Sequence, residues 1–388
     1  MNRRDLIAHR LEQFDSSAIR YAFSLAQKIK DPIDLSIGFP EDNTPDSIKD
    51  AGINAIRDNH TRYTPSNGTA ELREAIAKKL HRENQIEVSS DNVTVVPGLT
   101  TGILLTYLAI LNPGDEIILP DPFFPPYRDL AIMLGAKVVN LDTFPDFQVT
   151  AERLKKIITP KTKAILINSP NNPSGAVYPE SELRKITELA DQHGIVVISD
   201  EIYEHFNYDA PHFSIGSIYQ NTLTMNGFSK AFAMTGWRLG YIAGPDVMIS
   251  AINELQQYVV FSTSSVAQAA GIEALNYNPE AMTKKYRAKR DLVINGLSKN
   301  FELHGAAGAF YAFIKLPEGI DDLEFVNLAA KKDLIILPGR AFSAHHDYVR
   351  VAFGNNEEQI KRGIEVINSL IEDHKTGNVS LGKRHRAV

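Results

Sequence analysis

The chain has 388 residues, of which 43% are hydrophobic and 23% charged, and its formal net charge is −6. This composition is typical of a globular protein, and the length predicts two domains or one large domain with an appendage. The negative charge gives no broad attraction to nucleic acid or to anionic membranes. Because there are no cysteines, disulfides, thiolate metal sites and a cysteine nucleophile are excluded, and we expect no metal site.

The N-terminal segment MNRRDLIAHRLEQF mixes charged and apolar residues and has no continuous apolar stretch of the kind that a secretory signal needs. The longest apolar stretch, residues 103–111, is too short to span a bilayer. We therefore expect a cytoplasmic protein that has no membrane partner.

Seven short apolar runs, rich in β-branched residues, are separated by helical stretches. One of these stretches, 70–83, has Leu72, Ile76 and Leu80 on one face and Thr69 to cap it, and another, 100–111, is apolar nearly all round. The runs show no polar alternation, as expected for a mostly parallel sheet with helices on both faces. They are residues 93–96, 116–119, 136–139, 163–168, 195–199, 222–226 and 239–243.

The C-terminal third has a different pattern. Residues 280–300 predict one long basic helix, and residues 309–315, 334–337 and 348–353 predict strands of a smaller sheet. We therefore predict an α/β protein with a large domain (45–285) around a mostly parallel seven-stranded sheet. A smaller α+β domain would combine the N-terminal arm (1–44) with the C-terminal part (286–388).

Polar residues follow most of the predicted strands of the large sheet. In an open parallel sheet ligands bind beyond the carboxyl ends of the strands, so these residues are the candidates for a site. The segments are Gly98-Leu99-Thr100, Asp121-Pro122-Phe123-Phe124, the loop 168–175 with Asn172, Asp200-Glu201-Ile202-Tyr203, and Gly227-Phe228-Ser229-Lys230.

Taken singly, each of these residues has an ordinary explanation as a turn, a helix cap or a surface charge. Together they match a planar cofactor that carries a ring nitrogen, a ring hydroxyl, a phosphate and an aldehyde. Asp200 would pair with the protonated ring nitrogen, and Lys230 would supply the amine for the aldehyde. Asn172 and Tyr203 could donate to the ring oxygen, and Phe124 could stack on the ring face. The helix start at Leu99–Thr100, together with Ser229 and Arg238, could bind the phosphate.

The sequence also resembles a known family, the fold-type I, class I aminotransferases of the aspartate aminotransferase type. The resemblance rests on SPNNPSG, SDEIYEHF and GFSKAFAMTGWRLGYIAGP, and extends upstream through LSIGFPEDNTP and RYTPSNGTAELREAI and downstream through AGAFYAFIK and YVRVAFGN. It covers about residues 20–370 in family order, and it implies an aminotransferase that uses pyridoxal 5′-phosphate and acts on amino acids and 2-oxo acids.

The resemblance implies a role for each site residue. Lys230 would form the Schiff base and then move the Cα proton of the substrate. Arg350 would bind the substrate carboxylate, which the backbone at Gly38 would also approach. Tyr63 would reach the cofactor phosphate of a partner subunit, which implies a homodimer with shared active sites. Asp200, Tyr203, Asn172, Ser229 and Arg238 would be cofactor ligands.

Three alternatives compete with this interpretation. The same cofactor chemistry also serves β-lyases and other fold-type I enzymes, since the shared motifs do not separate them from aminotransferases. A cofactor-binding regulatory module is disfavoured because no basic helix-turn-helix precedes the family-like sequence, and a nicotinamide enzyme because no G-x-G-x-x-G follows the first strand.

Substrate preference rests on two positions. Some relatives that use dicarboxylates carry a lysine where this chain has Thr100, and some carry a tryptophan where it has Phe124. The hydroxyl and the phenyl ring favour neutral or aromatic amino acids, with glutamate and 2-oxoglutarate as one donor and acceptor couple.

Overall fold

The computed structural model describes residues 7–13 and 17–376. Residues 1–6 and 14–16 of the expected N-terminal arm lie outside the described residues, and so do residues 377–388 of the expected small domain. The N-terminal segment in which no secretory signal was expected is therefore described only in part. None of the described helices combines the length and the apolar character that crossing a membrane would require.

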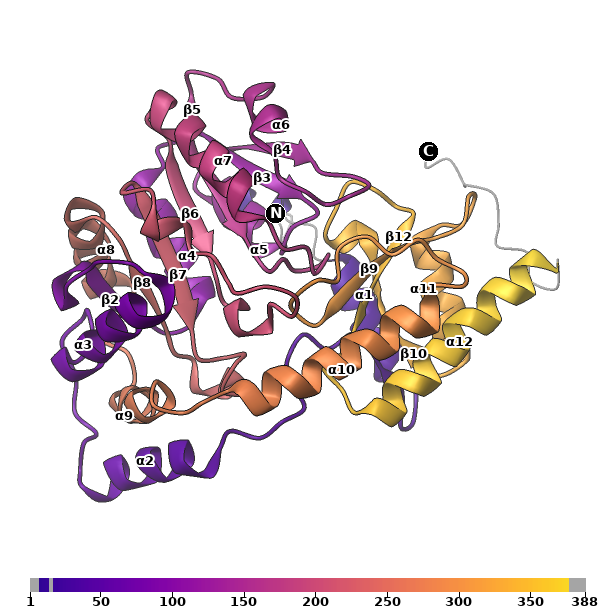
Figure 1. Ribbon diagram of the computed structural model, residues 1–388, viewed down its shortest axis with the longest axis horizontal. Helices are drawn as coiled ribbons and strands as arrows, with labels where there is room; N and C mark the ends of the chain where they lie inside the picture. Colours follow the sequence, from indigo (N-terminus) through magenta and orange to yellow (C-terminus); the bar gives the residue numbers. More distant parts are fainter. Residues whose placement is uncertain (1–6, 14–16, 377–388) are drawn as a thin grey trace.

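A seven-stranded sheet forms the centre of the large part of the molecule (Figure 1), and its strands correspond to the seven predicted runs. Their order across the sheet is β2-β8-β7-β6-β5-β3-β4. The strands are β2 (Val93–Val96), β3 (Glu116–Asp121), β4 (Lys137–Asp142), β5 (Thr162–Asn168), β6 (Val196–Asp200), β7 (Thr222–Gly227) and β8 (Gly240–Ala243).

Only β8 runs against the other strands of this sheet, since it pairs antiparallel with both β2 and β7. The remaining pairs are parallel. The carboxyl ends of six strands therefore share one edge of the sheet with the amino end of β8. Because of this reversal, a residue just before β8, such as Arg238, lies at the same edge as residues that follow β6 and β7.

Helices cover both faces of this sheet, which explains why its strands are apolar without alternation. Adjacent strand residues face opposite sides: Ile117 packs in one buried cluster with α4 and α8, whereas Ile118 packs in another with α6 and α7. The helices that cover the sheet are α4 (Leu99–Ile110), α5 (Pro126–Met133), α6 (Ala151–Lys155), α7 (Glu180–His193) and α8 (Asp246–Val259).

Two small sheets lie on the other side of the molecule. One is antiparallel, in the order β11 (Leu337–Pro338), β12 (Tyr348–Ala352) and β9 (Tyr311–Lys315). The other pairs β1 (Ile33–Asp34) in parallel with β10 (Leu334–Ile335). The prediction of one strand over 334–337 was therefore wrong: the N-terminal arm pairs with its first half, and β12 pairs with Leu337 and Pro338.

The other predicted helices are present with shifted ends. Thr69 caps α3 through a bond from the Leu72 amide, but α3 ends at Lys79 and continues as a π-helical turn, Leu80–Asn84. The long basic helix is α10, which ends at Leu297 and lies along α12 (Figure 1). The remaining helices are α1 (Ser17–Ala26), α2 (Asp46–Arg57), α3 (Ala70–Lys79), α9 (Ser265–Ala274), α10 (Glu280–Leu297), α11 (Asp322–Lys331) and α12 (Glu357–Lys375).

Candidate active site

A cavity of about 630 Å³ lies at the shared strand edge, between the large sheet and the N- and C-terminal segments. All of the predicted site residues except Tyr63 line it. They are Gly38, Leu99, Thr100, Phe124, Asn172, Asp200, Tyr203, Ser229, Lys230, Arg238 and Arg350. The rule that ligands bind beyond the carboxyl ends of parallel strands therefore located this cavity.

Asp200 ends β6 and places a buried carboxylate at the floor of the cavity. Its Oδ2 accepts a hydrogen bond from the Tyr127 hydroxyl at 2.7 Å, and its Oδ1 accepts one from the Ile202 amide at 3.1 Å. Burial raises the pKa of Asp200 to about 6, although both hydrogen bonds act in the opposite direction. A cation beside this carboxylate would favour its ionised form, so the site suits a positively charged ring nitrogen.

Tyr127 is a site residue that the sequence reasoning missed. It lies in the first turn of α5, which begins at Pro126, and its side chain is buried. Its ring also packs edge-on against Phe124, with 5.6 Å between ring centroids. The segment PFFPPY directly after β3 contains a signal for it. Proline is favoured at the first position of a helix, so the two prolines predict that Tyr127 lies in the first turn of a helix.

The two phenylalanines after β3 face different surroundings. Phe123 is buried in the core cluster beneath the sheet edge, and its amide donates to the Phe342 carbonyl. Phe124 lines the cavity. The geometry is therefore consistent with the prediction that Phe124, and not Phe123, is the ring nearest a ligand.

Lys230 comes three residues after β7, and its amine points into the cavity. Nζ donates a hydrogen bond to the Gly38 carbonyl at 2.6 Å and lies 5.6 Å from the centroid of the Tyr203 ring. Burial and the nearby guanidinium groups of Arg350 and Arg238 lower the pKa of Lys230 to about 8, while Asp200 opposes this shift. The amine is thus much easier to deprotonate than an ordinary lysine.

One end of the cavity is built to hold an anion. The helix α4 starts at Leu99, and its N-cap is Gly98, which has no side chain to accept from the free amides of the first turn. Arg238 lies against this glycine, since a Cβ on Gly98 would come within 2.4 Å of Arg238 Nη2. Ser229 adds a hydroxyl to the same cavity. Helix dipole, guanidinium and hydroxyl together suit a phosphate.

Arg350 is a buried cation at the opposite end, on β12. Nη1 donates to Asn172 Oδ1 at 3.0 Å, and Nη2 donates to the Ser36 carbonyl at 2.6 Å. Its Nε has no partner among the described residues, and no described carboxylate forms an ion pair with it. Burial lowers the pKa of Arg350. A buried guanidinium without a counter-ion is a ready site for the carboxylate of a ligand.

Below the cavity, a buried polar cluster supports the segment that carries Tyr203. Glu204 pairs with Lys79 at the end of α3, and both side chains are buried. Asn84, in the π-helical turn, donates to Glu204 Oε2 at 2.8 Å and accepts from Lys79 Nζ at 2.7 Å. This cluster fixes the chain directly after Tyr203 to a neighbouring helix.

Tyr63 lies outside the cavity, with 84% of its surface exposed. Its ring packs edge-on against Phe261, with 4.9 Å between centroids, and it lines a separate hollow with residues 61–62 and 262–266. Within one chain Tyr63 therefore contacts no part of the candidate site.

Several lining residues come from segments other than the predicted strand ends of the large sheet. The N-terminal arm and α1 supply Ile19, Phe23, Ser36, Ile37 and Phe39. The C-terminal part adds Tyr311, Leu337 and Phe342. The pairing of β1 with β10 and the packing of α1 against β11 bring the N-terminal segments beside the C-terminal part, so the positions of these residues depend on the tertiary fold.

The residues of the cavity fit pyridoxal 5′-phosphate, the cofactor that the sequence resemblance implies. The buried carboxylate of Asp200 matches the ring nitrogen, the low-pKa amine of Lys230 matches the aldehyde, and the α4 amino end with Arg238 matches the phosphate. Each functional group of the cofactor thus has a partner of complementary chemistry.

Comparison with known proteins also indicates an aminotransferase. A family profile described as aminotransferase class I and II matches residues 30–367. The chain is 38% identical over 355 residues to a probable aspartate/prephenate aminotransferase of Thermus aquaticus, which covers 89% of this chain and 92% of that protein. It is 34% identical over 385 residues to aromatic-amino-acid aminotransferase 2 of Thermococcus litoralis, covering 95% and 99% of the two chains.

A solved structure also matches closely. The aspartate aminotransferase of Thermus thermophilus with maleate superposes with a TM-score of 0.89 at 35% identity, over 94% of this chain and 99% of that one. The chain therefore belongs to the class I and II aminotransferases, and it is a pyridoxal-phosphate-dependent enzyme of fold type I that transfers amino groups.

Proposed function

We propose that Lys230, Asp200 and Arg350 divide the work of transamination between them. Pyridoxal phosphate, when bound, supplies an aldehyde that joins to amines and a ring that accepts electrons from Cα. Arg350 binds the substrate carboxylate. The Asp200 side chain stabilises the positive charge on the ring nitrogen, and Lys230 takes and returns the Cα proton. The observation that carries this proposal is the meeting of these three side chains in one cavity.

The lowered pKa of Lys230 predicts how the empty enzyme takes up cofactor. Only the neutral amine attacks an aldehyde, so the rate of pyridoxal phosphate uptake should rise about tenfold per pH unit below pH 8 and level off above it. Stopped-flow absorbance between pH 6.5 and 9.5 measures this rate. An unhindered lysine derivative is the control, and its rate should keep rising past pH 9.5. The same continued rise in the enzyme would contradict the assignment.

The walls of the cavity indicate its substrates. Ile19 and Phe23 of α1 and Ile37 and Phe39 of the N-terminal arm form an apolar surface. The cations that line the described cavity are Lys230, Arg238 and Arg350, and each already has a proposed partner in the cofactor or the substrate α-carboxylate. We therefore propose neutral and aromatic amino acids as preferred substrates, with glutamate and 2-oxoglutarate as one donor and acceptor couple.

Half-reactions with single amino acids test this preference. The change in cofactor absorbance should give a kcat/KM for phenylalanine at least about tenfold above that for aspartate, since a carboxylate side chain would be desolvated without a cation. Thr100→Lys should narrow this gap, because it places a cation at the edge of the cavity. Higher kcat/KM for aspartate than for phenylalanine in the unaltered enzyme would refute the substrate assignment.

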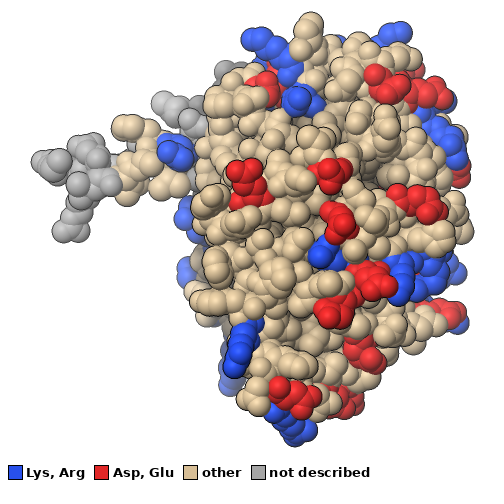
Figure 2. All heavy atoms as spheres, turned by 90° about the vertical axis from the view of Figure 1, so that its left-hand side faces the viewer, with Lys and Arg blue, Asp and Glu red and all other residues tan. Residues whose placement is uncertain are grey.

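We also propose a homodimer in which Tyr63 reaches the cofactor phosphate of the partner subunit. The support is an exposed aromatic cluster: Tyr63, Tyr258 and Phe261 are 84%, 82% and 57% exposed. Figure 2 shows the side of the molecule that carries α2, α3 and α8, where uncharged side chains form a broad area. Large aromatic side chains that are exposed together, as Tyr63 and Phe261 are, often mark a protein interface.

Sedimentation equilibrium tests the dimer. The expected mass is about twice the 43.1 kDa of one chain, and Tyr258→Asp should lower it towards the monomer. Tyr63→Phe should keep the dimer but weaken cofactor binding, because only a hydroxyl is lost. A monomer with full activity at micromolar concentration would refute shared sites.

Two further proposals concern organisation and location. We propose that the large domain (45–285) and the small domain (1–44 with 286–388) are joined through α10, since residue 285 falls within this helix. Mild proteolysis that separates two stable fragments within the large sheet would contradict this division. We propose a cytoplasmic location because the chain has no cysteines; cell fractionation that recovers the enzyme elsewhere would exclude it.

A further inference from the structure

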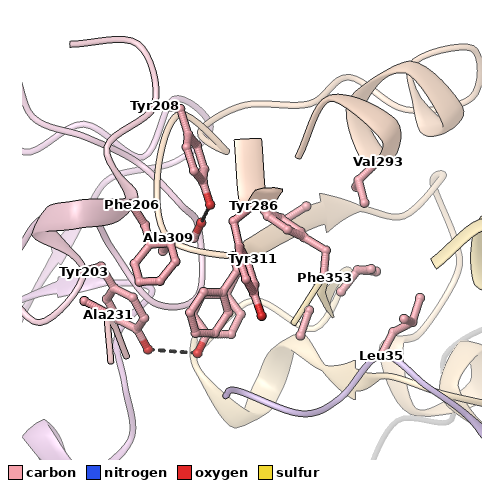
Figure 3. Close-up of a cluster of buried hydrophobic side chains, with 14 of the residues drawn as sticks. Leu35, Tyr203, Phe206, Tyr208, Ala231, Tyr286, Val293, Ala309, Tyr311 and Phe353 are labelled. Carbon is pink, nitrogen blue, oxygen red and sulfur yellow. Dashed lines mark hydrogen bonds between the residues drawn. The ribbon is translucent and has the colours of Figure 1, made fainter. Parts of the chain in front are cut away.

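Tyr311 is a buried residue of the cavity to which the proposed mechanism gives no role. It begins β9, and only 1% of its surface is exposed. Its hydroxyl lies 2.8 Å from the Tyr203 hydroxyl, a contact in which either oxygen could donate, and 3.2 Å from the Gly38 carbonyl oxygen. Figure 3 shows the Tyr203 and Tyr311 side chains meeting through their hydroxyl groups.

The ring of Tyr311 has a second contact. The guanidinium carbon of Arg350 lies 4.6 Å from the centroid of this ring and 4.6 Å from the centroid of the Phe342 ring. Two aromatic rings thus flank the cation, an arrangement that stabilises a guanidinium group that has little contact with water. Tyr311 is therefore in contact with both the proposed cofactor ligand Tyr203 and the proposed substrate ligand Arg350.

The hydrogen bonds around Tyr311 are limited by its single proton. A phenol donates one hydrogen bond and accepts two, so Tyr311 can donate either to the Tyr203 oxygen at 2.8 Å or to the Gly38 carbonyl at 3.2 Å. Burial raises the pKa of both Tyr203 and Tyr311, so both phenols keep their protons at neutral pH. When Tyr311 donates over the shorter of these distances, to Tyr203, the Tyr203 proton is left to face the cavity.

We propose that Tyr311 is a positioning residue with two separable functions, an inference that rests on the proposed roles of Tyr203 and Arg350. Its hydroxyl sets the direction in which Tyr203 donates, towards the ring oxygen of the cofactor. Its ring holds the Arg350 guanidinium in the plane that receives the substrate carboxylate. One side chain thereby links the group that tunes the cofactor to the group that binds the substrate.

Two substitutions separate these functions. Tyr311→Phe removes the hydroxyl and keeps the ring, whereas Tyr311→Leu removes both. The matched control is Tyr208→Phe. It removes a buried hydroxyl that donates to the Ala309 carbonyl in the same hydrophobic cluster, and Tyr208 does not line the cavity (Figure 3).

The first measurement is the pH midpoint of the visible absorbance of the cofactor-loaded enzyme. Tyr311→Phe should raise this midpoint by about half a pH unit or more, because a weaker donor at Tyr203 stabilises the ring oxygen anion less. Tyr208→Phe should leave the midpoint in place. No shift in Tyr311→Phe overturns the inference, and this holds even if Tyr311→Leu does not fold.

The second measurement is the dissociation constant of 3-phenylpropanoate, a carboxylate that has no amino group to react. Tyr311→Phe should bind it within about twofold of the unaltered enzyme, and Tyr311→Leu about fivefold or more weakly. Equal weakening in both variants would show a general structural role and overturn the inference. Arg350→Ala serves as the reference: if it binds the probe normally, the proposed function of Arg350 fails, and the ring's role fails with it.

Discussion

Replacement of Lys230 by alanine is expected to reduce transamination by at least about a thousandfold. In the proposed mechanism the substitution removes both the amine that joins to the cofactor aldehyde and the base that moves the Cα proton. A positioned general base alone contributes about 10²–10⁴-fold. No other amine lines the described cavity, so no neighbouring side chain can take over. Cofactor should still bind, because Asp200, Arg238 and the start of α4 remain.

Single-turnover kinetics with phenylalanine or glutamate measure this loss. Lys284→Ala is the matched control, since Lys284 is an exposed lysine that pairs with Glu280 one helical turn away. Loss of Lys230 should not destabilise the empty enzyme, because it removes a cation whose charged form is disfavoured by burial. Reduction of the loaded unaltered enzyme with borohydride should fix the cofactor to the peptide that contains Lys230. Near-normal turnover by Lys230→Ala would disprove its assigned role.

The sequence predicted the central sheet and the floor of the site for a common physical reason. A strand that is buried on both faces must be apolar throughout, so its ends can be found from the chain alone, and parallel strands bring those ends to one edge. Asp200 and Lys230 were found in this way, and the structure places both in the cavity. Arg238 precedes a strand and was found through the segment GFSKAFAMTGWRLGYIAGP. It lies at the same edge because β8 runs in the opposite direction to its neighbours.

Other parts of the site depend on packing between distant segments. Ser36 and Tyr311 lie far along the chain from the strand ends that they face in the cavity, and neither stands in a position that a rule for single strands selects. The split of the expected strand 334–337 has the same origin, since β1 pairs with its first half. Tyr127 is the exception, because the prolines before it mark the start of α5.

Arg350 is the second residue whose loss should have a large effect, and the reason is its lack of a counter-ion. A guanidinium group has five N–H donors, and the bonds to Asn172 and Ser36 leave Nε and further donors available. A substrate carboxylate can accept two of these bonds at once. Since hydrogen bonds to charged groups contribute about 1.5–3 kcal/mol each, Arg350→Ala should lower kcat/KM by about 10²–10⁴-fold.

Arg350→Lys distinguishes geometry from charge. Lysine keeps the positive charge but lacks the planar fork and the stacking between Tyr311 and Phe342, so kcat/KM should stay at least about tenfold below that of the unaltered enzyme. Arg184→Lys, a change in an exposed arginine of α7, is the control and should have no effect. Because Arg350 is a buried cation without a counter-ion, its replacement should not lower the melting temperature of the empty enzyme much. A large loss of stability with unchanged kinetics would show instead that Arg350 holds the fold together and does not bind the substrate.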